Sequence, residues 1–516
     1  MIWANLNKIM TIPNVKILKR WLLTNGLLVF GMFITAVAFV LCFSYSTSPL
    51  YFHDGYDSSV FQSMGLALLK GKIPYVDLFD HKGPILYFIN ALGLWIGGGK
   101  IGIVYLQIIA NTISFFFIYR TIRLFVDARS SVPLFFAILV LYALFYREGA
   151  HCEEWMLTCI STSLYISLND FFTQTTKRRI LLHSAYYGFC LAMCFLIRPN
   201  DAVIYIGGLM FGIFLWLVTQ RLYKQAFLNA VVMAATFVIC ALPSIIFYAH
   251  FDALDDMWYA MITYNTRYAN GFAGFFKSIT ASTKLMFFAP LLLTAVLVGV
   301  KQKPAILFVL VSQIILAWLF TGERLDRHYW ISLLPLISFV GIAAFYWKKI
   351  SIGLISLAVA CVIAISICNP VIAGKQVDRV KQIAQDYYVK QTLVYPFYAE
   401  SEKLFSFVPE HEQDQIWNYN LGFHVKPYSS IFVHHGVVQC NRVPFYMMVF
   451  IDETLRKSDD VKEKKPKWIM LSRDIESVWL VDDWQRRDWE YIQANYECIA
   501  MTNPSICEIE LWKRKD

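Results

Sequence analysis

WLLTNGLLVFGMFITAVAFVLCF, residues 21–43, is a predominantly apolar stretch without a charged side chain. A helix needs about 20 such residues to cross the hydrocarbon core of a bilayer. Further stretches of this kind begin at Ile101, Val132, Trp155, Ile180, Ala202, Ala226, Leu285, Ala305, Tyr329 and Ser351. Together they predict an α-helical polytopic membrane protein with about eleven transmembrane helices.

The composition of the 516 residues agrees with many spans. Hydrophobic residues make up 57% of the chain and charged residues only 16%, whereas soluble domains carry about 25% charged residues. So few charges cannot cover the surface of one globular body of this length, which excludes a wholly soluble protein. The net charge of +9 does not indicate a nucleic-acid partner, because the basic residues lie between the apolar stretches.

The polar breaks between the apolar stretches alternate in charge. One set is basic: Lys8, Lys16, Lys19, Arg20, Arg120, Arg123, Arg129, Lys177, Arg178, Arg179, Arg221, Lys224, Lys301, Lys303, Lys348 and Lys349. The other set mixes acids and bases: Asp54, Asp57, Lys82, Glu153, Glu154, Arg198, Asp201, Asp255, Glu323 and Arg327. By the positive-inside rule the basic set is cytoplasmic, so the N-terminus is predicted inside and, after an odd number of spans, the C-terminus outside. No small-residue cleavage site follows the first stretch, which favours a membrane helix over a cleaved signal peptide.

Two parts of the chain are predicted to lie outside the membrane. Within a transmembrane domain of residues 1–373, the loop at about residues 44–100 is too long for a simple connector. Residues 374–516 form the second part, in which the composition changes to polar and charged. Its hydrophobic pattern predicts a small extracytoplasmic α/β domain, with helices near 377–388, 446–456 and 484–496 and strands near 416–419, 431–433, 468–471 and 507–512.

This tail offers few candidate site residues. His434, His435 and Arg442 are interpreted as ordinary surface groups. Cys498 and Cys507 flank an Asn-Pro turn, and this spacing is equally compatible with a hairpin disulfide and with two unpaired thiols. No spacing of cysteines and histidines in the chain indicates structural zinc.

The first outward loop begins with the cluster HDGYDSSVF, residues 53–61. From Asp57 to Lys70 apolar residues recur at helical spacing, and Gly71 follows where the helix is expected to end. Asp57 is either the N-cap of this helix, a common role for Asp, or a functional carboxylate at the membrane edge. Asp54 lies close enough in sequence to compete for the second role.

The second cluster, PYVDLFDHKGP at residues 74–84, leads into an apolar run. Lys82 at the outer membrane edge is suited to bind an anionic headgroup, and a snorkelling lysine is the simpler alternative. The acids Asp77 and Asp80 beside it favour the first interpretation.

Other outward loops carry ionisable residues at 147–154, 198–201 and 323–329. Together they would bring several cations and carboxylates to one face of one helical bundle. Convergent arginines and lysines are typical of phosphate recognition, and carboxylates or histidines of acid–base chemistry. His151, Glu153 and Glu154 offer metal-ligand atoms, but their spacing is not specific and a structural loop is the favoured interpretation.

The segment HDGYDSSVFQSMGLALLKGKIPYVDLFDHKGPILYFINALG, residues 53–93, resembles the first extracytoplasmic loop of the GT-C superfamily of polytopic glycosyltransferases. Protein O-mannosyltransferases and lipid A aminoarabinose transferases are members of this superfamily. The shared plan is an acid after the first span, an amphipathic helix ending near Gly, an extended PY-D-FD segment and a KGP turn. A weaker resemblance continues at EEW (153–155), RPN (198–200) and RHYWISLLP (327–335). The tail is similar only in position and α/β character.

The resemblance implies a membrane enzyme that moves a hexosyl or pentosyl sugar from a polyprenyl-phosphate donor, in the bacterial inner membrane. The acceptor, a lipid, glycan or protein, would lie on the extracytoplasmic side. Asp57 matches the family's catalytic acid, and Lys82 matches the lysine associated with the donor phosphate. Many members have an Asp-Glu pair where this chain has Asp57-Ser58. The chain therefore departs from the family pattern at the residue that follows Asp57.

In that scheme Lys82, with Arg198 and Arg327, would hold the phosphate as a leaving group. Asp57 would accept the proton of the acceptor hydroxyl in an inverting displacement. No nucleotide-cradling glycine loop is present, and a divalent metal is compatible with the loops but not required by them. Contacts with the substrate are expected from a further set of residues: Asp80, His81, Glu153, Glu154, His328 and Tyr329.

Two other classes of protein compete with this prediction. A transporter or flippase of a lipid-linked glycan would line its pathway with the same charges, but no matched pair of broken helices occurs in the two halves. A structural assembly factor would depend on the tail, but the first loop holds more ionisable residues than a scaffold needs.

Overall fold

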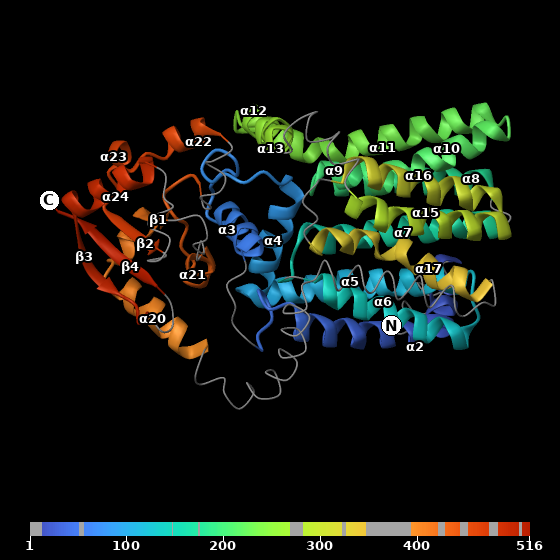
Figure 1. Ribbon diagram of the computed structural model, residues 1–516, viewed down its shortest axis with the longest axis horizontal. Helices are drawn as coiled ribbons and strands as arrows, with labels where there is room; N and C mark the ends of the chain where they lie inside the picture. The colour runs from blue at the N-terminus through green and yellow to red at the C-terminus, as the bar shows by residue number, and fades with distance from the viewer. Residues whose placement is uncertain are drawn as a thin grey trace, which may run out of the picture.

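The computed structural model describes residues 13–50, 56–146, 148–173, 176–268, 282–321, 327–346, 394–421, 429–443, 452–473, 483–504 and 508–515. Two parts lie side by side along the long axis of the molecule (Figure 1). One is a bundle of long helices, and the other is a smaller α/β unit built from the end of the chain. Helices α3 and α4, from the first long loop, lie between them.

The bundle is made of long, largely apolar helices: α2 (Pro13–Phe43), α5 (Lys100–Arg123), α6 (Ala128–Phe145), α7 (Cys152–Phe172), α8 (Lys177–Phe195), α10 (Gly208–Thr219), α11 (Tyr223–His250), α15 (Ser282–Lys301), α16 (Pro304–Phe320) and α17 (Leu334–Tyr346). The short helix α9 (Pro199–Asp201) and the π-helix η1 (Ala202–Gly207) continue directly into α10, and the 3-10 helix η3 (Arg327–Leu333) continues into α17.

Six helical stretches among the described residues are long and apolar enough to cross a membrane: Asn25–Phe43, Lys100–Arg123, Ala128–Phe145, Pro199–Thr219, Tyr223–His250 and His328–Phe345. The stretches expected from Trp155 and Ile180 are the helices α7 and α8. The α-helical membrane architecture is therefore confirmed. The count of eleven spans stays a prediction, because the stretch from Ser351 lies outside the described residues.

Close helix approach explains one pair of glycines in the bundle. The helix α4 (Pro84–Gly97) packs against the start of α5, and a Cβ atom on Gly102 would lie 1.9 Å from the carbonyl oxygen of Gly93. Only glycine fits at this distance, as is usual where helices associate without a large hydrophobic driving force. The contact fixes α4, and with it the turn that precedes α4, against the bundle.

The first long loop folds as its pattern predicts. The helix α3 (Tyr56–Leu69) ends just before Gly71, which has a φ of +75°. One side of α3 packs against α4, and α21 (Ser429–His434) of the tail also packs on α3. The predicted helix from Asp57 to Lys70 is confirmed, and it forms the link between the bundle and the tail.

The tail contains a mixed four-stranded sheet in the order β1-β2-β4-β3. Its strands are β1 (Ile416–Leu421), β2 (Trp468–Arg473), β3 (Tyr496–Met501) and β4 (Ile509–Arg514). β1 and β2 are parallel, whereas β4 is antiparallel to both β2 and β3. The helices of the tail are α20 (Val394–Ser406), α21 (Ser429–His434), α22 (Glu453–Ser458), α23 (Val461–Lys464) and α24 (Asp483–Asn495).

Alternating side chains give this sheet two separate hydrophobic cores. Residues of α20 and α21 cover one face, where Trp468 and Met470 are buried. The other face buries Ile469 and Leu471 against α24. This alternation is the expected result of a pleated strand between two helical layers, and it confirms the predicted α/β character.

Two tail predictions differ from the structure. Residues 431–433, expected as a strand, lie inside α21, because a short buried apolar run does not distinguish a strand from a helix. The strand β3 was not predicted: most of its side chains are not buried, and it has a register irregularity at Cys498 and Ala500. The helix near 377–388, most of that near 446–456 and Cys507 lie outside the described residues.

Candidate functional site

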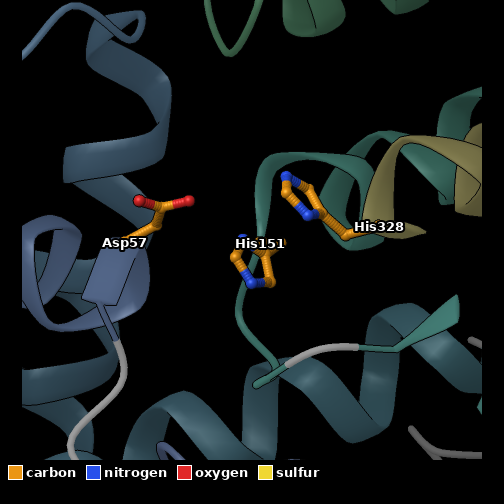
Figure 2. A group of neighbouring side chains, drawn as sticks. All are labelled: Asp57, His151 and His328. Atoms are coloured by element: carbon orange, nitrogen blue, oxygen red, sulfur yellow. The ribbon is translucent and has the colours of Figure 1, made fainter. Parts of the chain in front are cut away.

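Three chain segments bring Asp57, His151 and His328 together, and we call these residues the Asp57 cluster. Asp57 is in the first turn of α3, His151 is the N-cap of α7, and His328 is in η3. One ligand atom of each lies within 4.8 Å of the others. The two imidazoles stack with centroids 4.6 Å apart at 15°, and the Asp57 carboxylate faces them (Figure 2).

A buried carboxylate supports the cluster from behind. Glu148 accepts a hydrogen bond of 3.0 Å from Ser58 Oγ on α3, and its carboxylate lies 3.5 Å from His151 Nε2. Burial lowers the pKa of His151, but Glu148, with Asp57 and Glu153, outweighs that effect and raises the pKa above its usual value. Glu148 therefore links α3 to the loop before α7 and helps to orient the His151 ring.

The Asp57 cluster has donor atoms that suit a divalent metal. Two imidazoles and one carboxylate are a common ligand set for zinc and similar ions, with a further position open to water or substrate. A carboxylate behind a ligating histidine is the usual supporting contact. The sequence favoured a structural loop for His151, because its partners Asp57 and His328 come from other parts of the chain.

The turn that carries Lys82 is fixed through its backbone. Tyr75 and Tyr87 each donate a hydroxyl hydrogen bond to the Lys82 carbonyl, at 2.7 and 3.0 Å. The next amide, that of Gly83, donates to the Ile197 carbonyl at 2.9 Å. A Cβ on Gly83 would lie 2.1 Å from the carbonyl oxygen of Leu196, so the turn approaches too closely for any other residue. Lys82 is thereby placed beside the segment that leads into Arg198.

The side chains of Asp80, His81 and Lys82 form a short polar chain. Lys82 Nζ and His81 Nε2 are hydrogen-bonded, and His81 Nδ1 lies 3.5 Å from Asp80 Oδ1. Burial, together with the cations Lys82 and Arg198, lowers the pKa of His81 well below its usual value. A neutral His81 accepts the Lys82 hydrogen bond, which holds the ammonium in one direction. The ring of His81 is also stacked on Tyr264 at 5.3 Å.

Arg198 joins α7, α9 and η3. Its guanidinium forms ion pairs with Glu153 and, at 3.4 Å, with Asp201. It also lies 4.2 Å from the centre of the Tyr329 ring. The charges of Lys82 and Arg198 both act on His81. Arg198, Glu153, Tyr329 and Lys82 thus belong to one charged region at one end of the bundle.

Glu154 has a different environment. Its buried carboxylate accepts hydrogen bonds from Tyr146 Oη at 2.6 Å, Gln107 Nε2 at 2.9 Å and Asn111 Nδ2 at 2.7 Å. It also accepts the Ala150 amide at 2.7 Å. These contacts fix the turn that carries Glu148 and His151, and contact between Glu154 and a substrate stays a prediction.

The tail is bound to the Lys82 turn through Arg442, which was interpreted as an ordinary surface group. Arg442 donates two hydrogen bonds to the Tyr75 carbonyl, at 3.1 and 2.7 Å, and one of 3.0 Å to Asp256. Its own carbonyl accepts the Phe79 amide at 2.7 Å. Asp256 belongs to α12 (Leu254–Trp258), which follows α11. Arg442 therefore connects tail, loop and bundle, and the earlier interpretation is wrong.

A second tail contact lies near the first. Asp452 accepts hydrogen bonds from Tyr259 Oη and, at 2.5 Å, from Arg267 Nη1 in α13 (Asn265–Tyr268). Tyr264, which stacks on His81, lies in the same segment. Both tail contacts hold residues that surround the Lys82 turn.

The structure thus assembles most of the expected residues, and it adds some that the sequence did not single out. Asp54 lies outside the described residues, as does the side chain of Arg327. Glu148 was missed as a site residue, although its position three residues before His151 and its complete burial are typical of a supporting carboxylate.

Comparison with solved structures identifies the fold. No protein-family model matches the chain, and no curated protein matches its sequence significantly. ArnT from Cupriavidus metallidurans bound to undecaprenyl phosphate is similar at 11% identity and a TM-score of 0.58, over 95% of this chain and 98% of that one. ArnT in the apo state gives 10% identity and a TM-score of 0.52, over 96% and 98% of the two chains. The archaeal oligosaccharyltransferase AglB from Archaeoglobus fulgidus gives 12% identity and 0.48, over 88% and 70%. The chain therefore has the fold of ArnT.

Proposed function

We propose that this chain is an integral membrane glycosyltransferase that uses a polyprenyl-phosphate sugar donor. It transfers the sugar, a hexose or pentose, to an acceptor on the extracytoplasmic side of a cell membrane. The N-terminus is cytoplasmic and the tail extracytoplasmic. The fold supports this proposal, because ArnT of similar fold was solved with undecaprenyl phosphate bound. The observation that carries it is the backbone pairing of Gly83 with Ile197, which brings Lys82 next to Arg198 at the same end of the bundle as Asp57.

Lys82 binds the donor phosphate first. Its ammonium is oriented by His81 and faces a region where Arg198 adds a second positive charge. A phosphate at the membrane surface gains charge-assisted hydrogen bonds from both groups. The same contacts strengthen as negative charge develops on the phosphate when the sugar departs, and this lowers the barrier to transfer.

Asp57 then accepts the proton of the acceptor. The acceptor oxygen forms a bond to the anomeric carbon, the bond from that carbon to the phosphate oxygen breaks, and its electron pair leaves with the polyprenyl phosphate. The proton of the acceptor hydroxyl passes to Asp57, and the configuration at the anomeric carbon inverts. Asp57, His151 and His328 would hold a divalent metal, which when bound would neutralise phosphate charge. A carboxylate has two oxygens, so Asp57 retains one for the proton.

The test is transfer from a radiolabelled polyprenyl-phosphate sugar by the purified full-length protein. We expect Asp57→Asn and Lys82→Ala each to lower the transfer rate by about 10²-fold or more, within the range for acid–base and electrostatic catalysis. Asp77→Asn and Lys72→Ala are matched controls in the same loop: among the described residues, the Asp77 carboxylate accepts a hydrogen bond from the Ile73 amide alone, and Lys72 is exposed. Transfer or donor hydrolysis that survives both site changes would refute the assignment. Movement of intact donor across vesicles without cleavage would support a flippase.

A further inference from the structure

A half-open polar pocket lies in the bundle, away from the Asp57 cluster. It has a volume of about 390 Å³ and is lined by Asn25, Leu28, Tyr119, Arg120, Arg123 and Leu124. We call it the Arg120 pocket. Its residues come from the start of the apolar part of α2 and from the end of α5, which continues into Leu124.

The Arg120 pocket belongs to the opposite membrane face. Arg120 donates a hydrogen bond of 3.0 Å to Tyr165 Oη in α7. Tyr165 lies about 20 Å further along that helix than His151, at about 1.5 Å per residue. Because α7 begins at the Asp57 cluster, the pocket is near the other end of the bundle. In the predicted orientation this is the cytoplasmic face, where basic residues predominate.

The two arginines of the pocket have neutral hydrogen-bond partners. Arg120 donates to Asn25 Oδ1 at 3.3 Å and to Tyr165, while Arg123 donates to the Val126 carbonyl at 2.6 Å. Across the described ranges of the chain, neither guanidinium forms an ion pair with an acidic side chain. Asp127 is the acid whose pKa Arg123 affects. Its side chain caps α6 and accepts hydrogen bonds from Ser130. The positive charge of the pocket is therefore not neutralised by direct contact.

The surroundings of the pocket indicate a lipid. Leu28 and Leu124 form part of its wall, and the neighbouring α2 residues Leu27 and Phe30 are 87% and 60% exposed. Exposed apolar side chains on a membrane helix contact acyl chains, so the pocket opens where an apolar surface meets a basic one. Guanidinium groups bind phosphate oxygens in a fork, and basic pockets between membrane helices on the cytoplasmic side bind lipid headgroups.

We propose that the Arg120 pocket binds the phosphate headgroup of an anionic phospholipid in the leaflet opposite the Asp57 cluster. Arg120 and Arg123 supply the charge, and Asn25 and Tyr119 supply polar contacts. The site is separate from the donor site and does not depend on sugar transfer. A simpler alternative is that the arginines only stabilise the C-terminal end of α5, as basic residues in a last turn commonly do.

The test measures the thermal unfolding of delipidated full-length protein reconstituted with phosphatidylglycerol or with phosphatidylcholine. We expect phosphatidylglycerol to raise the Tm of the wild type. The Arg120→Gln/Arg123→Gln variant should lose most of that rise and should bind phosphatidylglycerol at least about tenfold more weakly than the wild type does. Arg129→Gln, an exposed arginine at the same face outside the pocket, is the matched control. If the double variant does not fold, Arg123→Gln alone replaces it in the same measurements, because this change removes one hydrogen bond to a carbonyl.

Four outcomes would overturn the proposal. Equal phosphatidylglycerol effects in the double variant and the wild type would show that the pocket does not bind the lipid. An equal loss in Arg129→Gln would show a general surface-charge effect. A saturable Tm rise with inorganic phosphate that matches the lipid effect would assign the pocket to a free anion. A lower Tm of the double variant in both lipids, without any lipid preference in the wild type, would leave helix capping as the role of the arginines.

Discussion

At the scale of single residues, the charged region depends on groups that support others. Glu148 lies behind His151, and His81 lies beside Lys82. Neither supporting contact follows from the motifs alone. The sequence singles out Asp57 and Lys82 as candidate site residues, because each lies in a short local pattern. It does not show that Glu148, from the next outward loop, accepts a hydrogen bond from Ser58 on α3. The contact between Glu148 and Ser58 joins segments 90 residues apart in the chain, so the packing of the helices determines it.

Glu148 provides a test of the support for His151. We expect Glu148→Gln to lower the transfer rate by about 10- to 100-fold, because a neutral amide no longer orients His151 as the carboxylate does. Ser58→Ala removes only the hydrogen bond to Glu148 and should have a smaller effect. Steady-state transfer rates and the Tm of both variants provide the comparison. A Glu148→Gln enzyme with the wild-type rate would contradict the supporting role.

His81 gives the molecule a predicted pH dependence. Burial lowers its pKa well below the usual value of about 6.5, so the unfolded chain binds a proton at mildly acidic pH more readily than the folded chain does. The stability from His81 is therefore complete above about pH 6.5 and is lost as the pH falls below it. We expect the wild type to lose more Tm between about pH 7 and pH 5 than His81→Gln does. Parallel Tm profiles for the two proteins would disprove this assignment.

At the scale of elements, the helices were easier to predict than the strands. Apolar length and the positive-inside rule are local properties, so α2, α5 and α11 could be located from the sequence. The strand β3 could not, because most of its side chains are not buried and its pairing with β4 is irregular at Cys498 and Ala500. The short α21 could not, because it packs against residues that are distant in sequence, such as Trp468 and Met470. Intrinsic preference is weak for such short segments, and tertiary contacts decide their structure.

The turn between α3 and α4 has little room for a larger side chain at Gly83. We expect Gly83→Ala to destabilise the protein by about 1–3 kcal/mol, because the added Cβ would overlap the Leu196 carbonyl. It should also weaken donor binding, since Lys82 would move away from Ile197 and Arg198. Gly31→Ala in α2, where nothing lies within 4 Å of the new Cβ, is the control. If Gly83→Ala and Gly31→Ala change the Tm and the donor affinity equally, the lack of space at Gly83 does not matter for the site.

At the scale of the whole molecule, the tail is part of the site's framework. Tyr75 has a φ of +73°, a conformation that costs a non-glycine residue about 1–3 kcal/mol. Its carbonyl is bound by Arg442, its amide by the Leu78 carbonyl at 2.6 Å, and its hydroxyl by the Lys82 carbonyl. The tail therefore helps to hold the loop in an unfavourable backbone conformation. The sequence predicted the domain but not this contact, since Arg442 and Tyr75 are 367 residues apart.

Removal of the Arg442 contact should weaken the site without touching it directly. We expect Arg442→Ala to raise the KM for the donor several-fold and to lower the rate of transfer, since the Lys82 turn loses about 1–3 kcal/mol of hydrogen bonding. Arg442→Lys, which keeps the charge but not the fork of donors, should restore only part of the loss. Arg487→Ala, an exposed arginine on α24, is the control. Identical donor kinetics for Arg442→Ala and Arg487→Ala would exclude a positioning role for the tail.

The contact between Arg442 and Tyr75 also bears on how the protein is made. Tyr75 is synthesised long before Arg442, and most of the membrane helices lie between the two residues in the sequence. The loop can therefore form this contact only after the last part of the chain has been translated and has crossed to the same side of the membrane as the loop. We expect nascent or prematurely terminated chains that lack this contact to bind the donor more weakly and to transfer the sugar more slowly than the complete chain.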